Sequence, residues 1–166
     1  MKGTGLVKDA VVAGVAGYGA TKVMSKATTL LYERQSEEAK KKEQQVSYGV
    51  AYTVAATKAA KLVGVELSEQ AASKAGTLLH YGLGLGWAPL YLLLRKRGVS
   101  PFGAGVAAGL SMSLIVDEVA NPLLGLTPPP QAYPVATHLR GLAGHLVYGL
   151  SLAAMAEATW KLLGRK

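Results

Sequence analysis

The residues best suited to chemistry gather in the last third of the chain. Residues 117–149 read DEVANPLLGLTPPPQAYPVATHLRGLAGHLVYG and hold two carboxylates, two histidines, an asparagine, an arginine and most of the prolines. Imidazole and carboxylate side chains suit proton transfer, metal or haem ligation, or the hydrogen bonding of a polar ligand. With two residues from upstream, the candidate polar site comprises His80, His145, His138, Asp117, Glu118, Asn121, Arg140 and Lys26.

A divalent metal is one hypothesis, with His80, His145 and Asp117 as ligands, because nitrogen and carboxylate donors suit zinc or iron. Two spacings oppose it. Adjacent residues diverge by about 100° on an α-helix, so we expect only one of Asp117 and Glu118 to point inward. His138 and His145 would stand about 10 Å apart along a helix, and the i, i+4 histidine spacing of many zinc sites does not occur.

A b-type haem is a second hypothesis, with His80 and His145 as axial ligands and the flanking glycines leaving room for the ring. Close helix packing explains the same glycines equally well. A third hypothesis is that the polar groups bind or relay a proton, an ion or a small polar ligand. The sequence itself requires no cofactor.

The fourth interpretation is purely structural. Lys26 would pair with Asp117 or Glu118, and the histidines would hydrogen-bond across closely packed helices. The sequence contains no GxSxG, HExxH, Walker or dinucleotide-binding motif. We therefore expect a protein without enzymatic activity.

Composition indicates a membrane protein of one domain. Half of the 166 residues are hydrophobic and only 17% are charged, below the roughly 25% typical of soluble domains. The chain has no cysteine, which excludes thiolate metal sites and cysteine nucleophiles. The net charge is +8, and the basic residues lie at the ends of apolar stretches. That placement is typical of contact with lipid headgroups rather than with nucleic acid.

Two apolar runs are long enough to cross a bilayer. Leu78 to Leu94 has seventeen residues with His80 as its only ionisable group, and Val99 to Val116 has eighteen residues without charge. We predict an all-α integral membrane bundle of about four transmembrane helices in a single domain over residues 1–166. Its parts are helix 1 at 1–31, a charged insert at 33–67, helix 2 at 68–97, helix 3 at 99–121, a Pro-rich outer loop at 122–135 and helix 4 at 136–163.

The insert at 33–67 begins with ERQSEEAKKKE, in which acidic and basic residues nearly cancel. We expect one amphipathic helix over about 36–64 that lies at the interface, and a further spanning helix over 46–64 is the alternative. Ser68 is predicted to cap the helix that follows. Basic clusters end helices 2 and 4, which predicts cytoplasmic N and C termini and an outer loop on the opposite side.

A short repeat accompanies this pattern. The four-residue spacing Gly76-His80-Gly84-Ala88 recurs as Gly141-His145-Gly149-Ala153, and the string AGVA occurs at 13–16 and at 104–107. The repeat predicts a duplicated helical hairpin that brings both histidines to the same depth. Gly105 and Gly109 form a GxxxG pair, which favours close approach of another helix.

The loop residues NPLLGLTPPP, the proline after them and GHLVYG resemble the YagU-like bacterial inner-membrane proteins, most strongly over 122–149. The resemblance implies a multi-pass protein of the bacterial cytoplasmic (inner) membrane, with the loop Pro122 to Pro130 and His145 as its signature. It implies no activity or ligand, and it does not extend to Asp117 and Glu118.

The predicted function is that of a small non-enzymatic inner-membrane protein with an outward-facing pocket of histidines and carboxylates. It would act in envelope homeostasis or as an accessory subunit of a larger membrane complex, with the lipid bilayer and further copies of itself as partners. Metal or haem binding through His80 and His145 is the first alternative. The second is a conduit for a proton, an ion or a small solute, formed by an oligomer.

Overall fold

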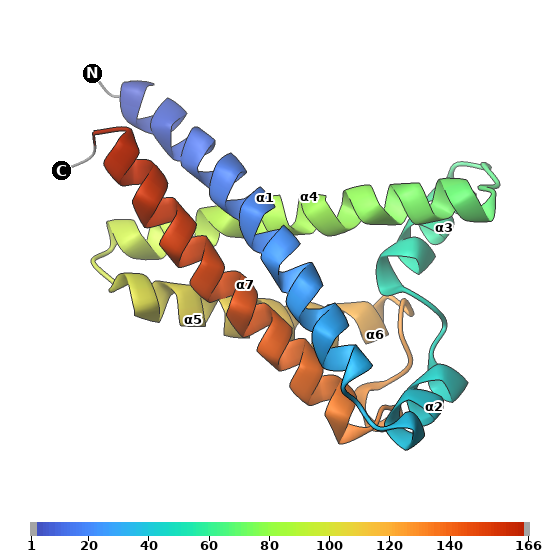
Figure 1. Cartoon of the computed structure of the whole chain (residues 1–166). Helices are drawn as coiled ribbons and strands as arrows, with labels where there is room; N and C mark the ends of the chain where they lie inside the picture. The colour runs from blue at the N-terminus through green and yellow to red at the C-terminus, as the bar shows by residue number, and fades with distance from the viewer. Residues whose placement is uncertain (1–2, 165–166) are drawn as a thin grey trace.

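A computed structural model describes residues 3–164, and these residues form helices and turns without a strand (Figure 1). The helices, in chain order, are α1 (Gly3–Glu33), α2 (Glu37–Val46), α3 (Ala51–Leu62), α4 (Glu69–Lys96), α5 (Pro101–Met112), the π-helical η1 (Ser113–Ala120), α6 (Asn121–Leu123), the 3-10 turn η2 (Pro130–Ala132) and α7 (Val135–Leu162). The all-α prediction is confirmed, and each of the four long predicted helices begins and ends within a few residues of the helices observed.

Helices α1 and α7 run antiparallel and side by side (Figure 1). At one end the Lys8 ammonium donates to the Leu163 carbonyl at 2.6 Å. At the other end the Gln35 side-chain amide donates to the Ala136 carbonyl at 2.9 Å. The start of α1 and the end of α7 therefore lie together, and we call this side of the bundle the termini end.

Helices α4 and α5 form a hairpin. Ser68 caps α4 by accepting from the Ala71 amide, as predicted, and Ser100 caps α5 by accepting from the Gly103 amide. Between them Gly98 adopts φ +86°, a conformation that only glycine reaches without strain. The turn lies at the termini end (Figure 1), so α1 and α5 run one way while α4 and α7 run the other.

The end of predicted helix 3 differs from an ordinary α-helix. After Met112 the backbone adopts π-helical hydrogen bonding over Ser113–Ala120, and a short turn of α-helix, α6, follows. π-Helical segments are rare and often occur at functional sites. This one carries Asp117 and Glu118.

The prediction of one continuous amphipathic helix over 36–64 is wrong. Two helices, α2 and α3, are separated by Ser47–Val50, where Gly49 has φ +106° and the Ser47 hydroxyl accepts from the Gly49 amide. A non-helical glycine and a serine that bonds the backbone locally both end helices. At twelve residues, α3 is also shorter than a membrane span requires, and it packs along the first half of α4.

Small residues set the close packing of the bundle. A Cβ on Gly105 would stand 2.7 Å from the Gly149 carbonyl oxygen, and a Cβ on Gly109 would overlap the His145 carbonyl oxygen. The predicted GxxxG pair therefore contacts α7 of the same chain. The Tyr148 hydroxyl, fully buried, donates to the Gly84 carbonyl and joins α7 to α4.

The contacts also show the repeat, in a different register from the one that the AGVA strings predict. Gly17 faces the Gly84 carbonyl and the Ala88 side chain, as Gly105 faces the Gly149 carbonyl and the Ala153 side chain. Gly17 thus corresponds to Gly105, three residues away from the AGVA match. In this register the identical pairs include Ala16 and Ala104, Gly17 and Gly105, Ala20 and Ala108, Met24 and Met112, and Ser25 and Ser113.

Two helices of the described chain are long and apolar enough to cross a membrane by length and composition: Glu69–Lys96 and Pro101–Leu123. The apolar run predicted at 78–94 lies within the first, and the run predicted at 99–116 overlaps the second from residue 101 onward. α1 and α7 are also as long as a span requires, but they do not meet the combined criterion of length and apolar composition.

Candidate functional site

A cavity of about 530 Å³ lies between α1, α3, α4, η1 and α7, at the end of the bundle away from the termini. His80 and His145 both line it, as the repeat predicts, and Asp117 and Arg140 line it as well. The rest of its wall is hydroxyl-rich and aromatic: Ser25, Thr28, Thr29, Tyr32 and Tyr52, with Met24, Val50 and Gly141. We call this the histidine cavity.

His145 is buried, with 4% of its surface exposed. Its Nε2 lies 2.8 Å from Asp117 Oδ2, and because a carboxylate only accepts, Nε2 carries the proton and donates. In the neutral ring Nδ1 then keeps a lone pair. That Nδ1 is buried and has no hydrogen-bond partner among the described residues.

His80 repeats this arrangement with a different partner. Its Nε2 lies 3.1 Å from the Ser25 hydroxyl, and that hydroxyl donates its only proton to the Thr21 carbonyl at 2.9 Å. Ser25 must therefore accept from His80, which places the proton of His80 on Nε2 as well. The Nδ1 of His80 is likewise buried without a partner within residues 3–164. Both histidines thus present an unpaired acceptor nitrogen.

Tyr52 packs its ring against His80, with the ring centroids 4.6 Å apart. Burial, and then the charge of Asp117, raise the pKa of Tyr52, so its hydroxyl stays protonated at neutral pH. The Tyr81 ring meets the His80 ring edge-on, with the two centroids 5.7 Å apart. A second cavity, of about 430 Å³, shares Ser25, Val50, Tyr52 and His80 with the first.

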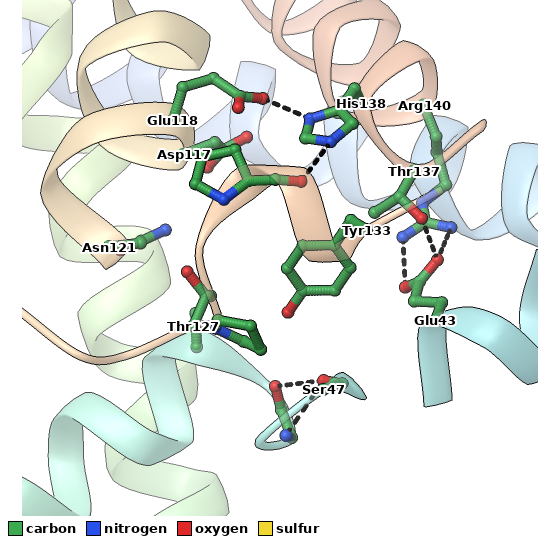
Figure 2. A pocket seen from close by; sticks show the side chains of 15 residues that line it. Glu43, Ser47, Asp117, Glu118, Asn121, Thr127, Tyr133, Thr137, His138 and Arg140 are labelled. Atoms are coloured by element: carbon green, nitrogen blue, oxygen red, sulfur yellow. Dashed lines mark hydrogen bonds and ion pairs between the residues drawn. The ribbon is translucent and has the colours of Figure 1, made fainter. Parts of the chain in front are cut away.

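A smaller cavity of about 210 Å³ adjoins the histidine cavity under the Pro-rich loop and shares Asp117, Arg140 and Gly141 with it. Figure 2 shows His138 here, between Glu118 and the loop. Its Nδ1 lies 2.7 Å from Glu118 Oε1 and its Nε2 lies 3.0 Å from the Pro130 carbonyl oxygen. Both partners only accept, so both bonds form together only when the ring is doubly protonated.

Arg140 and Glu43 close one side of this small cavity (Figure 2). The guanidinium donates to both carboxylate oxygens, at 2.9 and 2.7 Å, and the Thr137 hydroxyl donates to the same carboxylate at 2.7 Å. Arg140 also donates to the Gln35 side-chain oxygen. The clamp fixes α2 to α7 and neutralises the positive charge of Arg140 beside the cavity.

Burial raises the pKa of Glu43, but the hydrogen bonds from Arg140 and Thr137 and the charge of Arg140 outweigh burial and hold that pKa below its ordinary value. A carboxylate with a depressed folded-state pKa stabilises the fold above its unfolded pKa, about 4.3, and this stabilisation disappears as the pH falls through the folded value. We therefore expect Glu43→Gln to lower the free energy of unfolding at pH 7 by about 1.5–3 kcal/mol. The difference from the native protein should shrink below about pH 4, as measured by thermal unfolding in detergent.

Glu37 offers the control, because it lies on the same helix but pairs with Lys40 at an exposed position. Glu37→Gln should change stability little at any pH. A Glu43→Gln protein whose deficit stays constant down to pH 3 would contradict this assignment.

The structure corrects two predictions about the carboxylates. Asp117 and Glu118 both line the same small cavity, although only one was expected to point inward. They reach histidines two turns apart on α7, from the π-helical segment rather than from an α-helix. Lys26 is exposed. Asp117 and Glu118 bond His145 and His138, and not Lys26 as predicted.

Of the other predicted residues, Asn121 is buried and lines the small cavity, and Arg140 lines both cavities. Among residues 3–164, no group of three or more histidine, aspartate or glutamate side chains is placed to hold a metal ion. His80, His145 and Asp117 therefore do not form the predicted three-ligand set, because Asp117 bonds His145 instead. Sequence reasoning missed Ser25, Tyr52 and Glu43, and only the identity of Ser25 and Ser113 in the repeat could have indicated one of them.

Comparisons of the chain with protein-family models, with curated proteins and with solved structures found no match. The resemblance to the YagU-like proteins therefore stays a prediction from the loop residues.

Proposed function

We propose that this chain is a non-enzymatic integral membrane protein that binds a small polar ligand in the histidine cavity. The observation that carries the proposal is the pair of histidines, one from each half of the repeat, whose Nδ1 atoms are buried without partners beside one cavity. Buried polar atoms without a partner are rare in folded proteins and each requires an explanation. A ligand that donates hydrogen bonds supplies one.

The shape of the interior favours binding over passage. Between the histidine cavity and the termini end the bundle is filled by buried side chains, among them Tyr148, Leu152 and Met112, each no more than 1% exposed. Tyr148 bridges α7 and α4 about one helical turn closer to the termini end than the histidines. A blind cavity of this kind holds a solute, whereas a conduit requires an opening at both ends.

The membrane part of the proposal has all four long helices crossing the bacterial cytoplasmic membrane, with both termini inside. Large apolar side chains are exposed on the outer faces of all four: for example Val11 and Val15 on α1, Leu78 and Leu79 on α4, Phe102 on α5 and Leu139 on α7. Exposed apolar surface of this extent needs lipid or a partner. The cluster Arg95, Lys96 and Arg97, which directly follows the apolar run of α4 at the termini end, suits the cytoplasmic side.

We expect the protein to stay in bacterial membranes after a carbonate wash, because four apolar helices would hold it in the bilayer. A reporter fused after Lys166 should read out as cytoplasmic, and one inserted at Gln131 should read out as periplasmic. A protein released by the wash would be a soluble bundle, and a periplasmic reporter after Lys166 would reverse the topology.

Binding can be tested with the detergent-purified chain and a panel of probes: amino acids, polyols, alkylammonium salts, short carboxylates, Zn²⁺ and Ni²⁺. We expect at least one organic class to raise the unfolding temperature, since a ligand at 100 times its Kd adds about 2.7 kcal/mol to stability. Val50→Trp should abolish the effect, because Val50 is 65% exposed and lines the mouth of the histidine cavity.

Val63→Trp is the matched control, since Val63 is 75% exposed and lies outside the cavity. It should leave the shift intact. A panel without any stabilising class, or a shift that survives Val50→Trp, would contradict the binding function. Elemental analysis and an absorption spectrum of the same sample test the metal and haem alternatives, and a stoichiometric metal or haem lost in His145→Ala would replace the proposal.

A further inference from the structure

We propose that the ligand of the histidine cavity is a small organic cation with a primary ammonium group, an inference that rests on the binding function proposed above. The ammonium would donate to the Nδ1 atoms of His80 and His145 near the Asp117 carboxylate, and its organic part would lie against the ring of Tyr52. Four observations lead to this class of ligand.

The first is the balance of hydrogen-bond donors and acceptors. Asp117 and Ser25 hold the Nε2 protons of the two histidines, so both Nδ1 atoms are acceptors in the neutral rings. A carboxylate ligand brings only acceptors, which leaves these nitrogens unpaired. A primary ammonium brings three donors and no acceptor, so one such group carries enough donors for both nitrogens.

The second is charge. Arg140 lines the cavity, but Glu43 neutralises it with two hydrogen bonds at 2.9 and 2.7 Å. When His145 is neutral, its Nε2–H bond to Asp117 does not offset the charge of that carboxylate. The wall therefore carries one uncompensated carboxylate when the histidines are neutral, and a cationic ligand complements it. The Asp117 side chain is 30% exposed, so its charge does not itself require a partner, but a cation beside it gains from the attraction.

The third is the aromatic wall. The Tyr52 and His80 rings pack at a tilt of 50° with their centroids 4.6 Å apart, and Tyr81 extends the same cluster. Rings at this end of the bundle already contact the chain's own cations: the Lys22 ammonium lies 5.6 Å from the Tyr18 centroid, and the Arg140 guanidinium lies 5.0 Å from the Tyr32 centroid. A ring face near a carboxylate is a common setting for ammonium recognition.

The fourth concerns a bare metal ion. Among the described residues no three-ligand group exists, and one oxygen of Asp117 is already bonded by His145. Two histidines alone fall short of the four ligands that zinc usually takes. An organic cation needs fewer direct ligands and fills more of a cavity of about 530 Å³.

The test compares four probes that differ in charge and donors: butylammonium, 1-butanol, butyrate and tetramethylammonium. Equilibrium dialysis of the full-length protein in detergent, against empty micelles, measures binding. We expect butylammonium to bind at least about 10-fold more tightly than the other three, a difference of about 1.4 kcal/mol. Equal binding of 1-butanol or butyrate would overturn the proposal, and so would equal binding of tetramethylammonium, which has no N–H.

Adjacent carboxylates provide matched variants. Asp117→Asn keeps an oxygen to accept from His145 but removes the charge, and we expect it to weaken butylammonium binding about 10-fold or more. Glu118→Gln removes the charge of the neighbouring residue, which lines the small cavity and not the histidine cavity. It should change binding less than about 2-fold. Tyr52→Leu should weaken binding about 3- to 30-fold through loss of the ring face. Unfolding temperatures confirm that each variant is folded, and unchanged affinity in folded Asp117→Asn would overturn the proposal.

The two proposals fail in distinguishable ways. If butyrate or 1-butanol binds and Val50→Trp abolishes that binding, the cavity is a ligand site and only the ligand class is wrong. If no probe in either set binds, the binding function itself is wrong.

Discussion

Replacing Gly149 with alanine should destabilise the protein by about 3 kcal/mol or more, the upper part of the range for overpacking. A Cβ at this position would overlap the Gly105 carbonyl oxygen and stand 2.9 Å from the Gly109 amide nitrogen. Both obstacles are backbone atoms of α5, so no side chain can rotate away. The two helices must separate, which also loosens the packing beneath His145.

Gly82→Ala is the matched control, because a Cβ there has no atom of another residue within 4 Å. Alanine in a helix is more favourable than glycine by about 0.5–1 kcal/mol, so this variant should be slightly more stable than the native protein. The fluorescence of Trp87 and Trp160 reports unfolding in detergent, since one tryptophan hydrogen-bonds α5 and the other stacks on Tyr91. Equal effects of the two alanines would show that α5 and α7 are not held at contact distance.

The glycine pattern is also where sequence reasoning succeeds best. Four-residue spacing of small residues places them on one ridge of a helix, so the ridges through His80 and His145 could be read directly from the letters. Packing of Gly105 and Gly109 against α7 follows from the same rule. The register of the repeat could not be predicted in this way, because identical strings such as AGVA arise by chance in sequences rich in alanine and glycine. Contacts to the facing backbone set the register instead.

The break in the insert and the π-helical segment show two different limits. The break has a local signal in the sequence, Ser47 followed by Gly49, which could have predicted it because serine and glycine both favour turns. The stretch SLIVDEVA has no such signal. In its π-helical form, its two adjacent carboxylates each bond a histidine of the facing helix α7. Tertiary contacts of this kind lie outside local pattern analysis.

Charge pairing misled the site prediction for a similar reason. A lysine at the right depth looks like the natural partner of a carboxylate, yet a long flexible lysine can reach water, whereas a buried histidine N–H needs an acceptor nearby. His145 therefore takes Asp117, and Lys26 remains at the surface.

The Asp117–His145 pair should show the second large effect. Asp117→Leu removes the acceptor that His145, 4% exposed, has among the described residues, so both ring nitrogens become unpaired. An unsatisfied buried group costs about 1–3 kcal/mol, and we expect a loss near the upper value. Asp117→Asn should lose less than about 1 kcal/mol because its amide oxygen still accepts. Glu118→Leu should also lose less than Asp117→Leu, because its partner His138 has a side chain that is 31% exposed and water can replace the carboxylate.

The double variant Asp117→Leu with His145→Leu separates stability from binding. Replacing both members of a buried polar pair by apolar groups of similar size is often neutral or stabilising. We expect the double variant to recover most of the stability that Asp117→Leu loses, and to bind none of the probes. That combination would mean that the pair contributes little to holding the helices together. Losses that simply add in the two single variants would instead show that the two side chains do not interact, contrary to the 2.8 Å contact between them.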